Sequence, residues 1–237
     1  MGSEAFGSFA SSGSANSFSD SMARLLDRID VRLADSDEQR DAIFRLRHHA
    51  YSRDGTISPN FSGTFSDAYD EIGKVYLLGL YIDDELASSI RLHVASLEYP
   101  DFPSFEAFAD ILRPEIDAGK VIIDATRFVT DEKLSRLHRG LPYATLRLCM
   151  LAARNFGADL LLAAVGAEQR VFYEHAFDYR QMSESRPYPL LAKPISLMTL
   201  HYQAAAEQLN RRYAFFRSTL SERRMLFKQP VAGLLAS

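Results

Sequence analysis

The chain has 237 residues, of which 47% are hydrophobic and 24% charged, and its formal net charge is −4. These proportions are typical of a globular protein with its own core, and the slightly acidic balance argues against a nucleic-acid binder. The single cysteine, Cys149, excludes an intramolecular disulfide, and no run approaches the roughly 18 apolar residues of a membrane-spanning helix.

The first 20 residues are rich in Ser, Gly, Ala and Phe, and we expect them to form a flexible leader. They lack the basic start and apolar core of a signal peptide, so we expect a cytoplasmic protein. A short helix and a first strand are expected over 22–34. Ser36 and Gln39 have the spacing of a capping box, which predicts a helix from about 37 to 52.

One face of this helix carries Ile43, Arg47 and Tyr51, because they recur at intervals of four residues. An arginine in an apolar stripe either reaches out to solvent or faces a ligand. The loop 53–73 that follows contains D-A-Y-D at 67–70. Its two carboxylates suit a metal pair, a helix start or a polar recognition surface. Metal is the weakest of the three because no histidine lies nearby in sequence.

A hairpin is predicted by the apolar runs 75–82 and 86–95. In the second run, apolar residues alternate with Ser89, Arg91 and His93, so these three share the other face of the strand. That polar face either meets solvent or lines a cleft.

A short helix is expected around 105–112, followed by a strand over 121–128 with the sequence V-I-I-D-A-T-R-F. Its β-branched start is typical of a buried strand. Asp124 and Arg127 then interrupt the apolar run, although buried charges are costly without partners. They form either a structural ion pair or part of a functional site.

The second half begins with a basic loop over 133–140. Pro142 suits a first helical turn and Gly157 a helix end, which predicts a helix between them. The remaining expected elements are a buried strand over 159–165, a helix over 168–176, a strand over 195–201 and a long helix or helix pair over 204–227. This order predicts an α/β fold with a central mixed, twisted sheet flanked by helices.

Two segments of this half resemble the Gcn5-related N-acyltransferase (GNAT) superfamily. V-F-Y-E-H-A-F at 171–177 is similar to its F-Y-x-x-x-G-F segment, and R-G-L-P at 139–142 is similar to a reduced pyrophosphate loop. The resemblance implies a GNAT-like acyl-CoA N-acyltransferase fold over 21–203. A C-terminal helical extension would follow over 204–237.

A narrower resemblance covers about 31–201. L-R-H-H-A-Y, D-A-Y-D, S-I-R-L and D-A-T-R-F occur in the order found in two sister families. These are the N-acyl amino acid synthases and the acyl-homoserine-lactone (autoinducer) synthases. Asp124 stands where the lactone synthases usually have glutamate, and the chain has no tryptophan. The missing tryptophan argues against an S-adenosylmethionine pocket and for a plain amino acid as acceptor.

The resemblance implies a catalytic set and a substrate-binding set. The catalytic set is Asp124, Arg127 and Tyr173; the substrate-binding set is Arg47, Tyr51, Asp67, Asp70, Arg91, Phe128 and Val129. Asp124 would accept the proton of the attacking amine, and an arginine would hold the acceptor carboxylate. Tyr173 would lie near the leaving sulfur, or would simply fill the core. We expect a β-bulge near 127–129 that turns Asp124 and Arg127 into one cleft.

The donor is expected to be an acyl-phosphopantetheine thioester, carried by acyl carrier protein or coenzyme A, with no permanently bound cofactor and no metal. Its acyl chain would lie between splayed central strands, unless an ordinary core fills that space. The resemblance assigns the phosphopantetheine or the carrier protein to Arg136, Arg139 and Gly140. A solvated charged face is the alternative.

These observations favour an N-acyltransferase that moves a medium or long fatty acyl group from acyl carrier protein (or acyl-CoA) to the amine of an amino acid by direct attack on the thioester. Three alternatives stay open. They are an acyl-homoserine-lactone synthase using S-adenosylmethionine, a transferase of small acyl groups, and a non-catalytic module that binds acyl groups or carrier protein.

Overall fold

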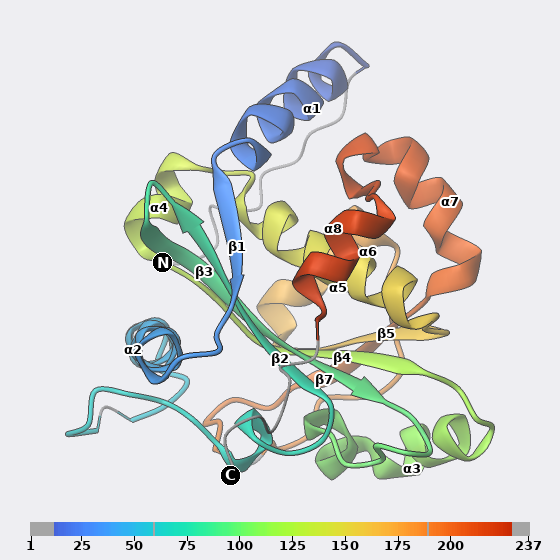
Figure 1. Cartoon of the computed structure of the whole chain (residues 1–237). Coiled ribbons are helices and arrows are strands. Elements are labelled where there is room, and N and C mark those ends of the chain that lie inside the picture. Colours follow the sequence, from blue (N-terminus) through green and yellow to red (C-terminus); the bar gives the residue numbers. More distant parts are fainter. Residues whose placement is uncertain (1–11, 59, 189, 229–237) are drawn as a thin grey trace, which may run out of the picture.

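The computed structural model describes residues 12–58, 60–188 and 190–228. Its centre is a mixed seven-stranded sheet with the strand order β1-β2-β3-β4-β5-β7-β6 (Figure 1). The strands are β1 Ile29–Leu33, β2 Val75–Ile82, β3 Glu85–Ala95, β4 Ile122–Thr130, β5 Leu160–Val165, β6 Arg180–Gln181 and β7 Ser196–His201. All pairs are antiparallel except β4 with β5. The expected mixed α/β fold is confirmed.

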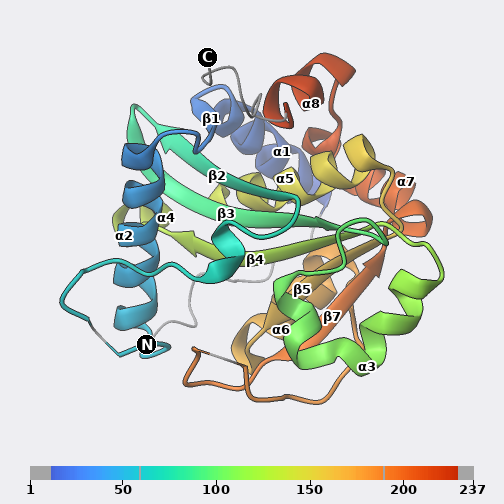
Figure 2. The same ribbon diagram turned by 60° about the horizontal axis from the view of Figure 1, so that its bottom comes forward.

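Helices cover both faces of the sheet. They are α1 Ser12–Leu26, α2 Asp37–Arg53, η1 Ala68–Asp70, α3 Pro103–Asp117, α4 Glu132–Leu137, α5 Leu141–Phe156, α6 Ala167–Phe177, α7 Tyr202–Arg212, η2 Ala214–Phe216 and α8 Leu220–Leu226. The helices α2 and α3 lie on one face, whereas α5, α8 and α1 lie on the other (Figure 2). The larger apolar core lies on the α5 side, because that helix buries almost its whole length.

Local sequence signals set several of these boundaries. Ser36 and Gln39 form the expected capping box of α2. Pro142 lies in the first turn of α5, and Gly157 ends that helix with a left-handed φ of 65°. The loop expected over 133–140 contains the short helix α4, whose first turn is capped by Asp131.

Strand β4 is regular only in its first half. Ile122 to Ala125 pair in parallel with Leu160 to Ala163 on β5, and β4 then runs on to Thr130 without that partner. The two central strands therefore separate beyond Ala125. This is the splay expected from the sequence.

The second half of β4 carries the expected β-bulge. Ser89 pairs with Val129 and Arg91 with Thr126, so β4 has one more residue than β3 between these pairs. Arg127 takes up the difference with a φ of +54°, a left-handed conformation that costs about 1–2 kcal/mol for a residue with a side chain. The bulge turns Arg127 to the sheet face that carries Arg91, where a regular strand would point it away.

Both ends of the chain add helices to this core. Helix α1 begins at Ser12, within the segment 1–20 expected to lack structure, and residues 1–11 lie outside the described residues. Of the long helix or helix pair expected over 204–227, the structure has the pair, α7 and α8, with η2 between them. Arg147 of α5 holds this extension by donating to the backbone oxygens of Phe215 and Arg217, at 2.5 and 3.0 Å. No described helix is long and apolar enough to cross a membrane.

Candidate active site

The site is built around arginines buried on the α2 and α3 face of the sheet. Arg47 of α2 is fully buried, and its Nη1 donates to both carboxylate oxygens of Asp70 at 2.8 and 3.0 Å. Asp70 ends the short helix η1, whose capping box includes the 2.9 Å bond from Asp67 N to Asp70 Oδ2. The D-A-Y-D segment thus forms a rigid turn that presents two carboxylates to the sheet.

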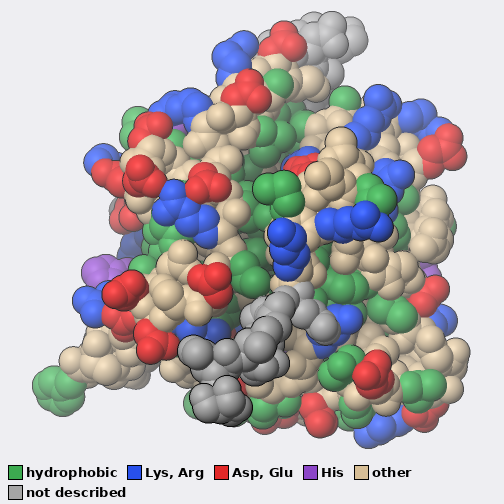
Figure 3. Space-filling view, viewed as in Figure 1, with side chains coloured by type: hydrophobic (Ala, Val, Ile, Leu, Met, Phe, Trp, Pro, Cys, Tyr) green, Lys and Arg blue, Asp and Glu red, His purple; other side chains and the backbone are tan. Residues whose placement is uncertain are grey.

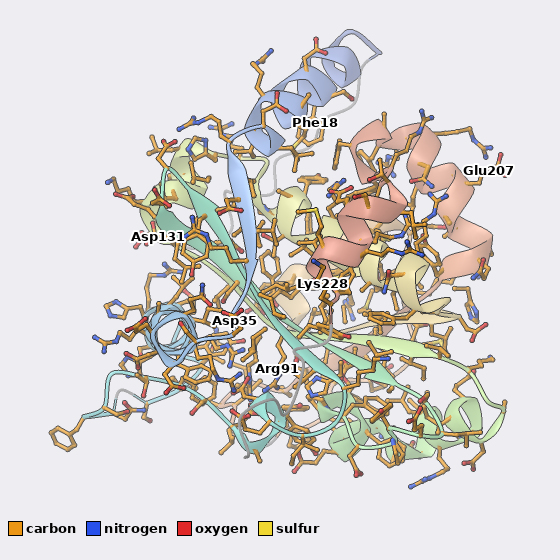
Figure 4. The ribbon with its side chains drawn as sticks, in the orientation of Figure 1. Phe18, Asp35, Arg91, Asp131, Glu207 and Lys228 are labelled. Carbon is orange, nitrogen blue, oxygen red and sulfur yellow. The ribbon has the colours of Figure 1, made fainter. Side chains whose placement is uncertain are left out.

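Arg91 of β3 joins these carboxylates. Its Nη1 donates to Asp67 at 2.6 Å and to Asp70 at 2.9 Å, and its Nε donates to the Thr126 hydroxyl at 3.1 Å. Arg91 has no exposed surface and lies close to η1 (Figure 4). The polar face expected on this strand therefore lines an interior site and does not meet solvent.

The bulge residue Arg127 completes the cluster. It donates from Nε and Nη2 to Asp67 Oδ2 at 3.0 and 2.6 Å, and its guanidinium lies 4.7 Å from the Phe65 ring and 5.9 Å from the Tyr51 ring. Burial alone would raise the pKa of Asp67. The hydrogen bonds and charges of Arg91 and Arg127 outweigh it and lower that pKa to about 2.

Positive charge exceeds negative charge in this group of five side chains, which we call the arginine cluster: Arg47, Arg91, Arg127, Asp67 and Asp70. Within the described residues, Nε and Nη2 of Arg47 and Nη2 of Arg91 are buried and have no hydrogen-bond acceptor. Buried polar groups are normally paired, so these donors mark a place that is incomplete without another group. The arrangement suits an anionic ligand such as a carboxylate.

Asp124 lies on the same face but is engaged elsewhere. It is fully buried, and its two oxygens accept hydrogen bonds from Ser104 N at 2.9 Å and Ser104 Oγ at 2.7 Å, at the start of α3. Burial raises the pKa of Asp124 against the opposing effect of these bonds and of Arg91. A carboxyl with raised proton affinity can accept a proton, yet its contacts also anchor α3.

Three residues near the arginine cluster are not among the site residues predicted from the sequence. Ser104 holds Asp124, and His93 pairs with Asp124 across the strands. Tyr188, between β6 and β7, is buried, and burial raises the pKa of its hydroxyl. The charges of Asp124 and Arg127 also act on this pKa, so both residues lie near Tyr188. The alternation of β3 gave a signal for His93. Nothing in the sequence pattern marked the other two.

His93 is buried and uncharged. Burial, followed by the charge of Arg91, lowers the pKa of its imidazole to about 3. Its ring meets Tyr69 edge-on, with ring centroids 6.1 Å apart.

The remaining expected site residues lie around the second half of β4. Val129 is buried, and its carbonyl oxygen accepts a 2.8 Å hydrogen bond from Ser88, while Phe128 is partly buried in the α5-side core. Tyr173 of α6 is buried in an aromatic group, and burial raises the pKa of its hydroxyl. Tyr51 and Tyr173 are near enough for Tyr51 to contribute to that shift.

The expected phosphopantetheine residues lie apart from the arginine cluster. Arg136 is exposed and pairs with Glu132, and Arg139 is exposed. Gly140 precedes α5, where the Leu141 N–H already donates to His138 O at 2.9 Å and Pro142 has no N–H. Among the first three residues of α5, only Tyr143 keeps a backbone N–H without a recorded acceptor.

A hollow of about 360 Å³ lies beside the cluster. Phe65, whose ring covers Arg127, forms part of its wall. The other lining residues come from two loops, one after α2 and one before β7: Thr56, Ile57, Ser58, Asn60, Leu190, Leu191 and Ala192. The two loops are joined by a 2.9 Å hydrogen bond from Ala192 N to Thr56 O. Among the described residues, no group of three or more His, Cys, Asp or Glu side chains is placed to hold a metal.

The family of the chain follows from comparison with known proteins. The family model described as N-acyl amino acid synthase FeeM matches residues 42–201, which include every member of the arginine cluster. The chain belongs to the N-acyl amino acid synthase family. It is therefore an N-acyltransferase. A search of curated proteins gave no match.

Solved structures agree with the fold of an N-acyl amino acid synthase. FeeM, an N-acyl amino acid synthase from uncultured soil microbes, is 18% identical with a TM-score of 0.63, covering 81% of this chain and 99% of FeeM. The acyl-homoserine-lactone synthase LasI is 12% identical with a TM-score of 0.58, covering 76% and 95%. The CoA-dependent lactone synthase BjaI is 14% identical with a TM-score of 0.55, covering 78% and 88%. The GNAT-like architecture inferred from the sequence is thereby confirmed.

Proposed function

We propose that the chain transfers a medium or long fatty acyl group from a carrier-bound thioester to the amino group of an amino acid. The observation that carries this proposal is the arginine cluster, with its unpaired buried donors, beside the bulge at which β4 leaves β5. A site of this kind offers charge to an amino acid carboxylate next to a gap between strands.

The acceptor would bind with its carboxylate toward Arg91 and Arg127. The Arg91 Nη2 donor is unused, and Arg127 lies under Phe65 at the wall of the 360 Å³ hollow. The rest of the acceptor would occupy that hollow, whose walls include Ile57, Phe65 and Leu191 as well as polar groups.

In the chemical step, the neutral amine attacks the thioester carbon, the carbon–sulfur bond breaks, and an amide and a free thiol result. Asp124 is the proposed acceptor of the amine proton, because its raised pKa gives it proton affinity on the correct face. Tyr173 is the proposed donor to the leaving sulfur, since burial keeps its hydroxyl protonated. The backbone around Val129 would contact the thioester oxygen.

A carrier-borne donor fits the start of α5 better than coenzyme A does. A pyrophosphate needs several backbone N–H groups at a helix start, whereas in the first turn of α5 the Leu141 N–H is already bonded to His138 O and Pro142 has none. Residues 202–228 contain six basic and two acidic side chains, in a chain of net charge −4. Figure 3 shows Lys and Arg side chains gathered over α7 and α8, which would favour an acidic carrier protein.

The test offers acyl carrier protein thioesters and acyl-CoA thioesters of several lengths to a pool of amino acids and identifies products by mass spectrometry. We expect N-acyl amino acids from carrier thioesters, with slower reaction from acyl-CoA. S-adenosylmethionine converted to an acyl lactone would select the lactone-synthase alternative. Tight thioester binding without turnover would select the non-catalytic module.

A further inference from the structure

Helix α1 lies outside the family-matched residues 42–201, yet it rests on the start of α5. Phe18 meets Tyr143 of α5 edge-on, with ring centroids 5.1 Å apart, and also meets Phe215 of η2 at 6.1 Å. Met22 has no exposed surface, and Leu25 is only 7% exposed. One apolar stripe, at intervals of four and three residues, thus holds α1 against the body of the protein.

The contact at Gly140 is especially close. A Cβ built on Gly140 would lie 2.4 Å from the sulfur of Met22 and 3.0 Å from Leu25 Cδ2. A side chain at residue 140 would therefore force the ends of the Met22 and Leu25 side chains to move. Helix α1 therefore covers Gly140, which the family resemblance assigns to binding of the phosphopantetheine group.

Beneath α1 lies the region where the donor arm is expected. Helix α5 follows β4 after the short α4, and the rings of Tyr143, Phe172 and Phe177 pack together between α5 and α6. Tyr213 and Phe216, around η2, pack against the same group. Segments from both ends of the chain thus cover this aromatic group.

Within residues 19–26, helix α1 is held by apolar packing alone. For residues 19–26 the structure records no side-chain hydrogen bond and no ion pair, and Asp20, Ala23 and Arg24 are exposed. The helix joins β1 through the turn at 27–28, and it projects beyond the sheet at the top of Figure 1. Strand β1 pairs with β2 from Ile29 to Leu33, so its place in the sheet does not depend on α1.

We propose that α1 is a self-inhibitory lid on the donor site, and that it must leave Gly140 and Tyr143 before a carrier-borne acyl arm can enter. This inference rests on the proposed function, because it assigns the region beside Gly140 and Tyr143 to that donor. Helix α1 itself lies outside the residues that the family match includes.

The absence of tryptophan in the chain gives a direct test. Phe18→Trp creates the only tryptophan, placed at the contact with Tyr143. We expect its emission to shift to the red when acyl carrier protein thioester is added, because α1 leaves its seat, and to stay unchanged when the amino acid is added alone. Emission that stays constant at saturating donor would overturn the lid.

A kinetic test uses the full chain. Met22→Ser with Leu25→Ser weakens the seat of α1, whereas Arg24→Ala alters an exposed side chain of the same helix and serves as the control. In the double variant, kcat/KM for the donor should rise by about tenfold, because a smaller fraction of the molecules holds α1 against Gly140. The KM for the amino acid should stay unchanged. Arg24→Ala should match the wild type.

An unchanged or lower donor kcat/KM in the double variant would contradict the lid. Phe18→Ala provides a milder second variant if the double substitution fails to fold, and the same rise is expected. Wild-type turnover tests the proposed function separately. If the amide forms but the tryptophan emission does not shift, the lid is contradicted and the transferase function stands. If the thioester binds and the emission shifts but no amide forms, the transferase function is contradicted and the lid stands.

Discussion

At the scale of single residues, the site depends on buried charges that satisfy one another. Asp67 accepts hydrogen bonds from both Arg91 and Arg127, so a neutral side chain there leaves two guanidinium groups undercompensated. Removing one partner of a buried ion pair costs far more than breaking an exposed pair. Asp67 is thus expected to support stability as well as function.

Asp67→Asn should lower the free energy of unfolding by about 3–5 kcal/mol, measured by urea denaturation at pH 7. The matched control is Asp110→Asn, which weakens the exposed pair with Arg186 and should cost less than about 1 kcal/mol. Equal small losses in the two variants would show that the arginine cluster is not a coupled buried network.

Asp124 has two candidate roles, as the base and as the anchor of α3, and a pair of variants separates them. Asp124→Asn keeps the shape of the side chain and a hydrogen bond with Ser104 but removes the proton acceptor. Ser104→Ala removes one hydrogen bond and keeps the carboxyl. We expect kcat to fall about 10²–10⁴-fold in Asp124→Asn and much less in Ser104→Ala. Similar losses in both, with similar thermal midpoints, would make Asp124 only an anchor.

The motifs located Arg47, Arg91 and Arg127, because charged residues in apolar patterns are costly and therefore visible. The partners of those residues were harder to assign. Ser104 lies 20 residues from Asp124 in sequence, and a serine at a helix start is common. Tyr188 reaches the site from a loop whose position depends on the whole fold. No local pattern carries such information.

At the scale of elements, the decisive feature is the bulge in β4. It places Arg127 on the face of Arg91 and coincides with the loss of pairing to β5. The bulge was expected because Asp124 and Arg127, three residues apart, would point to opposite faces of a regular strand. The helix start at Ser36 and the helix end at Gly157 were also predictable, because each depends on a few adjacent residues.

Two substitutions at Arg127 separate its backbone role from its side-chain role. Arg127→Gly and Arg127→Ala both remove the guanidinium, so both should lower kcat/KM for the amino acid by about 10–100-fold, corresponding to a lost charge-assisted hydrogen bond. Only glycine adopts the +54° φ without strain. The glycine variant should therefore be more stable than the alanine variant by about 1 kcal/mol. An alanine variant of equal stability would show that the bulge is unstrained.

The terminal elements were the least predictable. Helix α1 begins in a Ser/Gly-rich stretch that favours disorder by composition, and its apolar stripe of Phe18, Met22 and Leu25 gains a partner only from the folded body. The sequence left a single helix and a helix pair both open over 204–227, and Arg147 of α5 binds the backbone of residues 215 and 217 between α7 and α8. Tertiary contacts of this kind have no local signature.

At the scale of the whole molecule, the buried groups make stability depend on pH. The pKa of His93 is lowered from 6.5 to about 3, and that of Asp67 from 3.8 to about 2. Both values lie below those of the unfolded chain, so the unfolded state binds more protons as pH falls. The contributions of these two groups should be retained above about pH 6.5 and lost on acidification, first that of His93 and then that of Asp67, whereas the raised pKa of Asp124 acts in the opposite direction.

Urea midpoints measured between pH 7 and pH 4 test this dependence. The unfolding free energy should fall by roughly 1.4 kcal/mol per pH unit below pH 6 from His93 alone. His93→Asn should flatten this slope, whereas substitution of the exposed His201 by Asn should keep it. A wild-type slope in His93→Asn would show that the buried imidazole is not the group that titrates.

The arginine cluster and the end of the β4–β5 pairing support the proposed reaction, in which the acceptor carboxylate and the acyl thioester would meet at the bulge. The most direct measurement mixes the full chain with an acyl carrier protein thioester and a single amino acid, and follows free thiol and amide together. We expect one thiol and one N-acyl amino acid per turnover, with both products reduced in parallel in Arg127→Gly. Thiol release without amide, or the same amide yield from Arg127→Gly, would contradict the assignment of this cluster as the acceptor site.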